Sequence, residues 1–300
     1  MTEDQIKRSK EKQTKQRDDQ MPLKLMYITN SEDVAHIAEE AGVDRIFVDM
    51  EYIGKTDRQG GMDTVQSRHT ADDVRRLAQC LNKSELFVRV NPIHEKTDKY
   101  SSSKEEIDEV IEAGADLLML PYFKTAEEVQ TFVKYVDGRA KTVLLVETPE
   151  AAAIAENLVK IPGIDEMFIG LNDLSLGYGK NFMFELLLDG TVEELCLKFR
   201  KGGIPYGFGG IASLGKGMLP SEYVIKEHYR LGSTCAILSR SFCRTDQVTD
   251  LKEIQKIFET ELPKIRQLEE ECSVHSQYFW KNRQQVETKI RQICECEDAK

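Results

Sequence analysis

Two short polar segments follow neighbouring apolar runs near the middle of the chain. The segments are V-E-T-P-E-A at 146–151 and I-G-L-N-D-L-S at 169–175, and each places one carboxylate, Glu147 or Asp173, just past the end of its run. Apolar runs of this length are typical of strands buried in a parallel sheet. Two carboxylates at the ends of consecutive strands can share one divalent cation and leave its other positions open to a chelating substrate. The pattern therefore indicates chemistry.

Three further polar residues are predicted at the same strand ends. Asp49 and Glu51 follow an earlier apolar run, and Arg89 lies at the end of the next one. In a site for a metal-bound oxyanion, carboxylates hold the cation and an arginine faces the negative charge that develops on the substrate. A single carboxylate at a strand end often serves as a helix cap, but five polar residues at one edge of a sheet favour an active site.

The elements that must position these residues form a regular series. Apolar runs of about four to six residues alternate with helical patterns from residue 23 onward. The predicted strands are residues 24–28, 45–49, 86–90, 117–120, 142–146, 166–170, 206–210 and 235–239. Helical patterns follow nearly every strand, and several begin with a capping residue, namely Ser31, Thr70, Thr125 and Thr191. Eight such units predict an α/β fold, a (β/α)8 TIM barrel with its active site at the C-terminal ends of the strands. A doubly wound sheet is the alternative, and the lack of an early G-x-G-x-x-G disfavours it.

The chain divides into three parts. Residues 1–21 are almost wholly polar and are predicted to be a disordered tail. Residues 22–271 are predicted to form the barrel, and residues 272–300 an extra C-terminal helix that the barrel does not need. This extension carries Trp280, the only tryptophan. It is expected either to contact a neighbouring subunit or to fold back on its own barrel.

Composition excludes several classes of function. The formal net charge of the 300 residues is −11, which argues against a nucleic-acid-binding protein. No apolar run is long enough to span a membrane, and no signal peptide is expected. The seven cysteines include Cys294-x-Cys296 but form no disulfide framework, which favours a reduced, cytoplasmic setting.

Five motifs resemble one known family, in that family's order. They are the two segments above together with D-M-E-Y at 49–52, V-R-V-N-P at 88–92 and E-A-G-A-D-L-L-M-L-P at 112–121. Over about residues 23–245, the chain is similar to the HpcH/HpaI aldolase and citrate lyase family. The resemblance implies a (β/α)8 barrel that binds Mg²⁺ (or Mn²⁺ or Co²⁺) and acts on a pyruvate-like 2-oxo acid or an acyl-CoA thioester.

The resemblance also implies roles for single residues. Glu147 and Asp173 match the metal ligands of the family, and Asp49 and Glu51 match its acidic pair that holds metal-bound water. Arg89 matches the arginine that stabilises the enolate oxygen.

The substrate side of the site follows in the same way. The resemblance implies that backbone N–H groups receive the substrate carboxylate, those of Gly170, Leu171, Asn172 and Asp173. Family members often assemble through C-terminal helices, so a homo-oligomer is expected.

The sequence departs from the family at the acid/base group. The aldolase branch has a histidine after its D-x-E, paired with a carboxylate, whereas this chain has Tyr52, and Glu112 occupies the place of the carboxylate. A tyrosine with an ordinary pKa near 10 is a poor base at neutral pH. Proton transfer is then expected from metal-bound water, from a substrate phosphate, or from His69 or His94.

Loop residues offer weaker candidates. Lys55, Arg58 and Arg68 lie in a long loop at 52–69 and resemble basic residues of the citrate lyase branch, although solvated charges are the simpler interpretation. Gly210–Lys216 imitates a phosphate-binding loop without the Ser or Thr of a nucleotide hydrolase. Lys180 and Ser239–Ser241 also follow predicted strands.

We therefore expect an enzyme, a class II (metal-dependent) aldolase. It would cleave or form a pyruvate-derived 2-oxo acid and an aldehyde through a metal-stabilised enolate. An acyl-CoA ester lyase of the citrate lyase type is the second enzyme hypothesis. A barrel that binds a 2-oxo acid without turning it over is the third, and Tyr52 is the feature that keeps it open.

Overall fold

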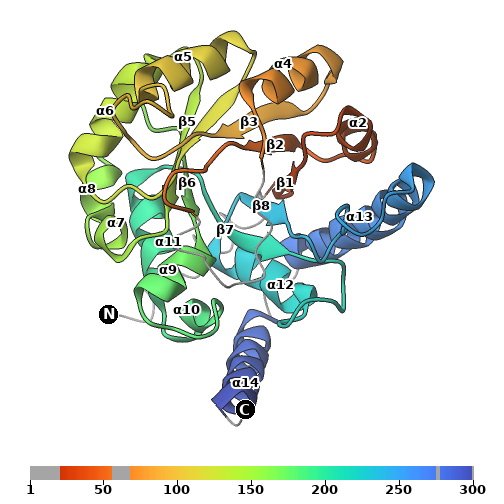
Figure 1. Cartoon of the computed structure of the whole chain (residues 1–300). Coiled ribbons are helices and arrows are strands. Elements are labelled where there is room, and N and C mark those ends of the chain that lie inside the picture. The colour runs from red at the N-terminus through yellow and green to blue at the C-terminus, as the bar shows by residue number, and fades with distance from the viewer. Residues whose placement is uncertain (1–20, 56–67, 275–277, 299–300) are drawn as a thin grey trace.

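Eight parallel strands close into a barrel in the computed structural model, which describes residues 21–55, 68–274 and 278–298 (Figure 1). Each strand pairs with the next in the sequence, and β8 pairs with β1. The strands are β1 Lys24–Ile28, β2 Arg45–Asp49, β3 Glu85–Arg89, β4 Leu117–Leu120, β5 Lys141–Val146, β6 Glu166–Ile169, β7 Tyr206–Ile211 and β8 Cys235–Leu238. The TIM barrel expected from the sequence is confirmed, with strand ends within one residue of the expected ones.

Helices surround the barrel on the outside (Figure 1). They are α2 Glu32–Glu40, α4 Ala71–Cys80, α5 Ser103–Glu112, α6 Ala126–Val136, α7 Pro149–Ala153, α8 Ala155–Leu158, α9 Leu171–Gly177, α10 Glu185–Leu188, α11 Thr191–Gly202, α12 Ser221–Leu231, α13 Leu251–Val274 and α14 Phe279–Asp298. Because α13 packs between α12 and α2, it completes the ring next to β1.

Capping side chains begin several of these helices where the sequence indicated. Ser31, Thr70 and Thr125 accept hydrogen bonds from the backbone of their first turns, and Thr70 and Thr125 form complete capping boxes. Thr191 was expected to cap α11 but is its first helical residue. The cap is Gly190 at φ +88, a left-handed conformation that glycine adopts without strain.

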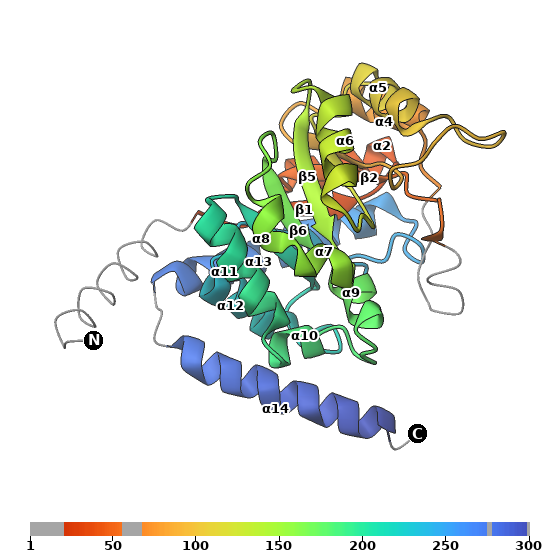
Figure 2. The same ribbon diagram turned by 90° about the vertical axis from the view of Figure 1, so that its left-hand side faces the viewer.

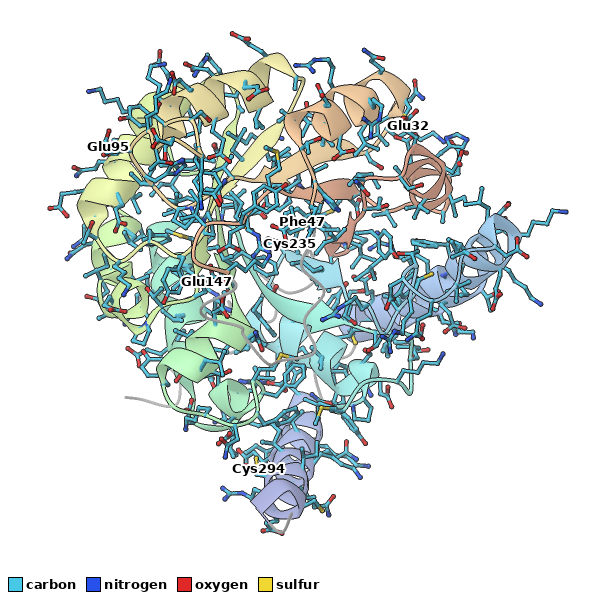
Figure 3. The ribbon with its side chains drawn as sticks, in the orientation of Figure 1. Glu32, Phe47, Glu95, Glu147, Cys235 and Cys294 are labelled. Carbon is cyan, nitrogen blue, oxygen red and sulfur yellow. The ribbon has the colours of Figure 1, made fainter. Side chains whose placement is uncertain are left out.

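Alternate strand residues point into the barrel, as the two-residue period of a strand requires. The interior is filled by a separate apolar cluster of Met26, Phe47, Phe87, Leu117, Met119, Val143, Leu145, Phe168 and Cys235. Figure 3, which looks along the barrel, shows Phe47 and Cys235 within the ring of strands. The next inward position after Phe47 is Asp49, and the next after Leu145 is Glu147. Inward alternation therefore places both carboxylates directly above the apolar plug, at the C-terminal ends of their strands.

The C-terminal extension folds back on its own barrel. Helix α14 packs against α12 and α10, and Figure 2 shows it running beneath α10. The Asn282 amide donates to the Tyr223 carbonyl at 3.2 Å and to Glu227 at 2.9 Å, which ties α14 to α12. Trp280 points outward and is 69% exposed, so it does not anchor this contact.

No helix among residues 21–55, 68–274 and 278–298 is both long and apolar enough to cross a membrane. The predicted tail lies outside the described residues, apart from Met21.

Candidate active site

A cavity of about 460 Å³ opens at the C-terminal ends of the strands. Residues from all eight strands line it, so it lies over the middle of the barrel. Asp49, Arg89, Glu147 and the segment Gly170–Asp173 are among its walls. The structure therefore brings most of the predicted site residues into one place, where parallel (β/α)8 barrels carry their active sites.

Asp49 and Arg89 form the best-defined pair of the cavity. They are register partners on β2 and β3, and the Arg89 guanidinium donates to both carboxylate oxygens of Asp49 at 2.8 Å. Lys55 adds a second cation, with its Nζ 2.7 Å from Asp49 Oδ2. Burial alone would raise the pKa of Asp49, but Arg89 and then Lys55 lower it further than burial raises it. Asp49 is therefore a permanently ionised anchor that orients Arg89.

Glu51 lies beside this pair and is 1% exposed. Its Oε2 is 3.4 Å from Arg89 Nη1 and 3.7 Å from Lys55 Nζ. Both distances are longer than those to Asp49, so the two cations are held mainly by Asp49. Arg89 and Lys55 therefore neutralise the charge of Glu51 less closely than they neutralise the charge of Asp49.

The carboxylate of Glu147 occupies space that is free because residue 170 is glycine. In the register of β5 and β6, Leu145 pairs with Phe168. Two residues further along both chains, the same register places Glu147 opposite Gly170. A Cβ atom on Gly170 would lie 2.7 Å from Glu147 Cβ and 2.9 Å from its Oε2. Glycine at this position is therefore required for the observed orientation of the carboxylate.

A strained loop residue holds the other oxygen of Glu147. Tyr122 has φ +47, a left-handed conformation that is costly for a side chain of this size, and its N–H donates to Glu147 Oε1 at 2.9 Å. Burial raises the pKa of Glu147 to about 8, with the Glu51 and Asp173 carboxylates adding to the effect and Arg89 opposing it. The carboxylate thus lies in a pocket that is short of positive charge.

The first turn of α9 provides the remaining predicted residues. Asp173 is 9% exposed and lines the cavity. N–H groups in a first helical turn have no acceptor within the helix, and here Leu171, Asn172 and Asp173 supply them. The structure does not agree with the expected use of Gly170, whose N–H donates to the Val146 carbonyl at 3.0 Å. The N–H of Gly170 is therefore already used within the barrel and is not available to a substrate.

The donor set fits a divalent cation that keeps open positions. Glu147 and Asp173 offer hard oxygen ligands, and burial followed by the neighbouring carboxylates raises the pKa of Glu147, so a cation would stabilise its ionised form. Among the described residues, a group of three metal-ligating side chains within 4.8 Å occurs elsewhere, at His36, Glu39 and Glu40 on α2. Two protein carboxylates completed by water and substrate is the pattern preferred by Mg²⁺.

Three predicted catalytic residues are not part of the cavity wall, namely Glu51, which lies beside Asp49, and Tyr52 and Glu112. Tyr52 is half-buried, its N–H donates to Asn91 Oδ1 at 2.8 Å, and burial followed by Asp49 raises its pKa to about 12. Glu112 ends α5, which runs from the upper rim back to the start of β4, so it lies at the opposite end of the barrel. The carboxylate of α5 that lies near Tyr52 is instead Glu106, which accepts from the Asn91 side chain at 2.9 Å.

The two candidate histidines have different surroundings. His94 is held by the Pro92 and Ser101 carbonyls and by Ser103, outside the cavity lining. His69 lies in the cavity wall and is 8% exposed. Of the two, His69 is placed to meet a substrate.

The basic loop residues also separate. Lys55 was expected to be a solvated charge, but it is 6% exposed and lines the cavity. Arg58 lies outside the described residues, and Arg68 is exposed. The resemblance singled out Lys55, but no sequence signal predicts its burial, because the burial depends on how residues 51–55 fold over Asp49.

The remaining loop candidates lie mostly outside the cavity wall. Ser239 and Arg240 line it, as do the glycines at 209 and 210. Lys216 is exposed, and the N–H of Gly215 donates to Glu222 at 2.9 Å, so this loop already holds a carboxylate.

Comparison with solved structures shows the fold. A HpcH/HpaI aldolase/citrate lyase family protein from Burkholderia cenocepacia is 17% identical with a TM-score of 0.58, over 81% of this chain and 99% of that one. The HpcH/HpaI aldolase from Desulfitobacterium hafniense is 14% identical with a TM-score of 0.56, over 82% and 96%. Tryptophan synthase from M. tuberculosis is 14% identical with a TM-score of 0.55, over 85% of this chain and 96% of that one. Structural similarity at this level therefore does not distinguish between enzymes that catalyse different reactions.

The sequence itself decides between these neighbours. A comparison with curated proteins gave no match. The family model of the HpcH/HpaI aldolase/citrate lyase family matches residues 24–186, which is more than half of the chain and includes every strand from β1 to β6. The chain therefore belongs to the HpcH/HpaI aldolase/citrate lyase family.

Proposed function

We propose that the chain is a divalent-metal-dependent carbon–carbon lyase that cleaves a hydroxylated 2-oxo acid to pyruvate and an aldehyde, and catalyses the reverse condensation. The observation that carries the proposal is the arrangement of charge in the cavity. A guanidinium fixed by Asp49 faces the cavity that Glu147 and Asp173 also line, and burial together with the Glu51 and Asp173 carboxylates raises the pKa of Glu147 despite the opposing effect of Arg89. Such a site favours a substrate on which negative charge develops beside a bound metal ion.

Glu147 and Asp173 would hold the cation, which would polarise the keto oxygen of the substrate as a Lewis acid. The N–H groups at the start of α9 would receive the substrate carboxylate. Arg89 would donate to the oxygen that becomes the enolate oxygen. Because Asp49 holds this guanidinium through two hydrogen bonds, Arg89 needs no reorganisation when the charge develops.

The proton of the enolate step is not expected to pass through Tyr52. Its pKa of about 12 keeps the phenol protonated at neutral pH, and its side chain is not part of the cavity wall. Water held near Glu51 and Asp49 is the remaining carrier. The cavity, at about 460 Å³, exceeds what pyruvate alone would fill, which leaves room for the aldehyde portion.

The test is the exchange of the pyruvate methyl protons in D₂O, followed by proton NMR with Mg²⁺ or Mn²⁺. Wild type is compared with Glu147→Gln, which keeps the side-chain size, and with Glu156→Gln, an exposed residue of α8 that serves as the control. We expect metal-dependent exchange by wild type and Glu156→Gln and a loss of at least about 100-fold in Glu147→Gln.

Other outcomes distinguish the alternatives. Pyruvate binding without exchange would contradict the lyase and favour a 2-oxo-acid-binding barrel. Exchange or cleavage seen with an acyl-CoA ester and absent with pyruvate would assign the protein to the citrate lyase type of reaction.

A further inference from the structure

His69 is the last residue before the cap of α4 and belongs to the wall of the cavity. It follows Arg68 and precedes Thr70, which caps the helix. The ring is almost fully buried but shares the cavity with Arg89 and Glu147. This position brings an imidazole to a site where the family's own histidine position is occupied by Tyr52.

The hydrogen bond to one ring nitrogen fixes the tautomer. The backbone N–H of Asp49 donates to His69 Nδ1 at 3.0 Å in a buried environment. A backbone N–H can only donate, so Nδ1 must carry a lone pair, and the ring proton of the neutral imidazole is on Nε2. In the described parts of the chain no group is bonded to Nε2, which leaves this N–H for a ligand.

Acting as a base would disrupt this arrangement. A second proton would have to go on Nδ1, which would leave the Asp49 N–H without its acceptor in a buried position, at a cost of about 1–3 kcal/mol. The charged groups around the ring are Asp49, Asp73 and Lys55. Burial lowers the pKa of His69, the two aspartates oppose this and Lys55 adds to it, and the net direction is downward. The ring therefore stays neutral near pH 7.

The order of the strands indicates which part of a substrate His69 meets. In a closed eight-stranded barrel, β2 lies opposite β6. The proposed binding groups for the 2-oxo acid end, Glu147 and the start of α9, follow β5 and β6. A substrate held there extends its other end across the cavity toward β1, β2 and β8, where His69 stands.

We infer that His69 is a neutral hydrogen-bond donor that binds one substrate oxygen through its Nε2–H. Before cleavage this oxygen is the C4 hydroxyl of the aldol, and after cleavage it is the carbonyl oxygen of the aldehyde. This assignment rests on the proposed lyase function. In cleavage the C4 hydroxyl gives its proton to water, the C3–C4 bond breaks with its electron pair passing into the enolate, and C4–O becomes a carbonyl. His69 keeps its proton throughout. In condensation the same N–H polarises the carbonyl.

Two substitutions separate the two ring nitrogens. His69→Asn places an amide oxygen where Nδ1 accepts from Asp49 and removes the distal donor. His69→Gln keeps an N–H near the Nε2 position and loses the Nδ1 acceptor. His36→Asn, at an exposed histidine of α2, is the control.

The probe reaction is the Mn²⁺-dependent condensation of pyruvate with glycolaldehyde, measured beside pyruvate methyl exchange. We expect His69→Asn to lower kcat for condensation about 100-fold more than it lowers exchange, with little change in the KM for pyruvate. His69→Gln should retain more condensation than His69→Asn but melt at a lower temperature. The reverse order would show a purely structural role and overturn the assignment.

The tautomer is measured directly by NMR of ¹⁵N-histidine-labelled protein. We expect a protonated Nε2 and an unprotonated Nδ1 for His69 from pH 7 to pH 8. A proton on Nδ1, or titration of the ring within this range, would overturn the inference. Exchange without condensation by wild type would remove the aldehyde-oxygen role and leave the enolate step standing, whereas no exchange by wild type would remove the proposed function itself.

Discussion

Substitution of Gly170 by alanine tests whether Glu147 is a metal ligand in the orientation that the structure shows. The added Cβ would lie 2.7 Å from Glu147 Cβ, 2.9 Å from its Oε2 and 3.1 Å from Leu145 Cδ1. Gly170 has φ −82 and ψ 91, which any residue can adopt, so the effect is steric and not a matter of backbone strain. The contacted Cβ belongs to the end of β5 and cannot rotate away. The carboxylate must therefore shift.

The magnitudes follow from this contact. Overpacking of this kind costs about 1–3 kcal/mol of stability, and displacement of a carboxylate from a metal site lowers affinity by about 10- to 100-fold. At a Mn²⁺ concentration 100 times the wild-type Kd, binding stabilises wild type by about 2.7 kcal/mol. The same concentration would stabilise a variant with 100-fold weaker affinity by only about 0.4 kcal/mol.

The assay is thermal melting with and without Mn²⁺, together with Mn²⁺ titration calorimetry. Gly202→Ala is a matched control, because its Cβ would lie 2.5 Å from the Cβ of Val159, the C-cap of α8, away from the cavity wall and also without a left-handed φ. We expect both variants to melt lower without metal and Gly170→Ala alone to lose the metal-dependent rise. Wild-type Mn²⁺ affinity in Gly170→Ala would refute the reasoning and show that Gly170 serves packing alone.

Arg89→Lys, which loses the two-point contact with Asp49, should lower pyruvate exchange about 100- to 1,000-fold, measured by NMR with Mn²⁺ saturating. The pKa of Glu147 is raised to about 8 in the folded, metal-free protein. Between about pH 5 and pH 8 the folded protein therefore keeps a proton on Glu147 that the unfolded chain has already released. The free energy of unfolding of the metal-free protein should therefore fall between about pH 5 and pH 8, as followed by urea denaturation, and Glu147→Gln should flatten this slope. Cation binding at pH 7 should release about one proton, measured by calorimetry in buffers of different ionisation enthalpy. Lys55→Met should destabilise the protein by about 3 kcal/mol, since it removes a buried partner of Asp49 and Glu51 and keeps the length of the side chain.

Each of these expectations has a contrary outcome. If the rate of pyruvate proton exchange by Arg89→Lys is within about threefold of the wild-type rate, a single positive charge at position 89 is sufficient for exchange. The two-point contact between Arg89 and Asp49 would then not be required. A pH-independent stability of the metal-free protein would show that Glu147 is already ionised at pH 5. A change under about 0.5 kcal/mol in Lys55→Met would place Lys55 among the weak surface pairs.

The sequence predicts the barrel well because the barrel depends on local patterns. Apolar runs and capping residues mark each strand and helix without knowledge of distant contacts, and the observed strands differ from the predicted ones by a residue at most. The same inward alternation that builds the core carries Asp49, Arg89 and Glu147 to the rim. Their convergence could therefore be predicted, since it follows from strand order alone.

Side-chain placement in loops could not be predicted in the same way. The burial of Lys55 depends on the path of residues 51–55, and the left-handed Tyr122 has no signal comparable to a glycine. The role of Asn91, which accepts from the N–H groups of both Tyr52 and Ile53, likewise arises from contacts across strands. Such contacts have no local pattern in the sequence.

The assignment of Glu112 has a different cause. A helix after a barrel strand returns to the start of the next strand, and α5, ten residues in length, spans about 15 Å between the two ends. A residue at its last position therefore lies far from the rim, whereas Glu106, in its first turns, lies near it. The expected barrel topology already implied that the last residue of α5 lies far from the active-site rim. The assignment of Glu112 followed its position in the motif and did not take this into account.

The distribution of cations divides the carboxylates of the site into two kinds. Asp49 receives a bidentate guanidinium and a buried ammonium group, which keep its pKa low and leave little reason for it to bind a further cation. Arg89 acts on Glu147 as well, but burial and the Glu51 and Asp173 carboxylates outweigh it and raise the pKa of Glu147 to about 8. A divalent ion gains most where charge is least compensated, so it should bind on the β5–β6 side of the cavity. The enolate oxygen must then lie between this ion and Arg89, and that leaves the β2 side of the cavity, with His69, for the carbonyl of the aldehyde.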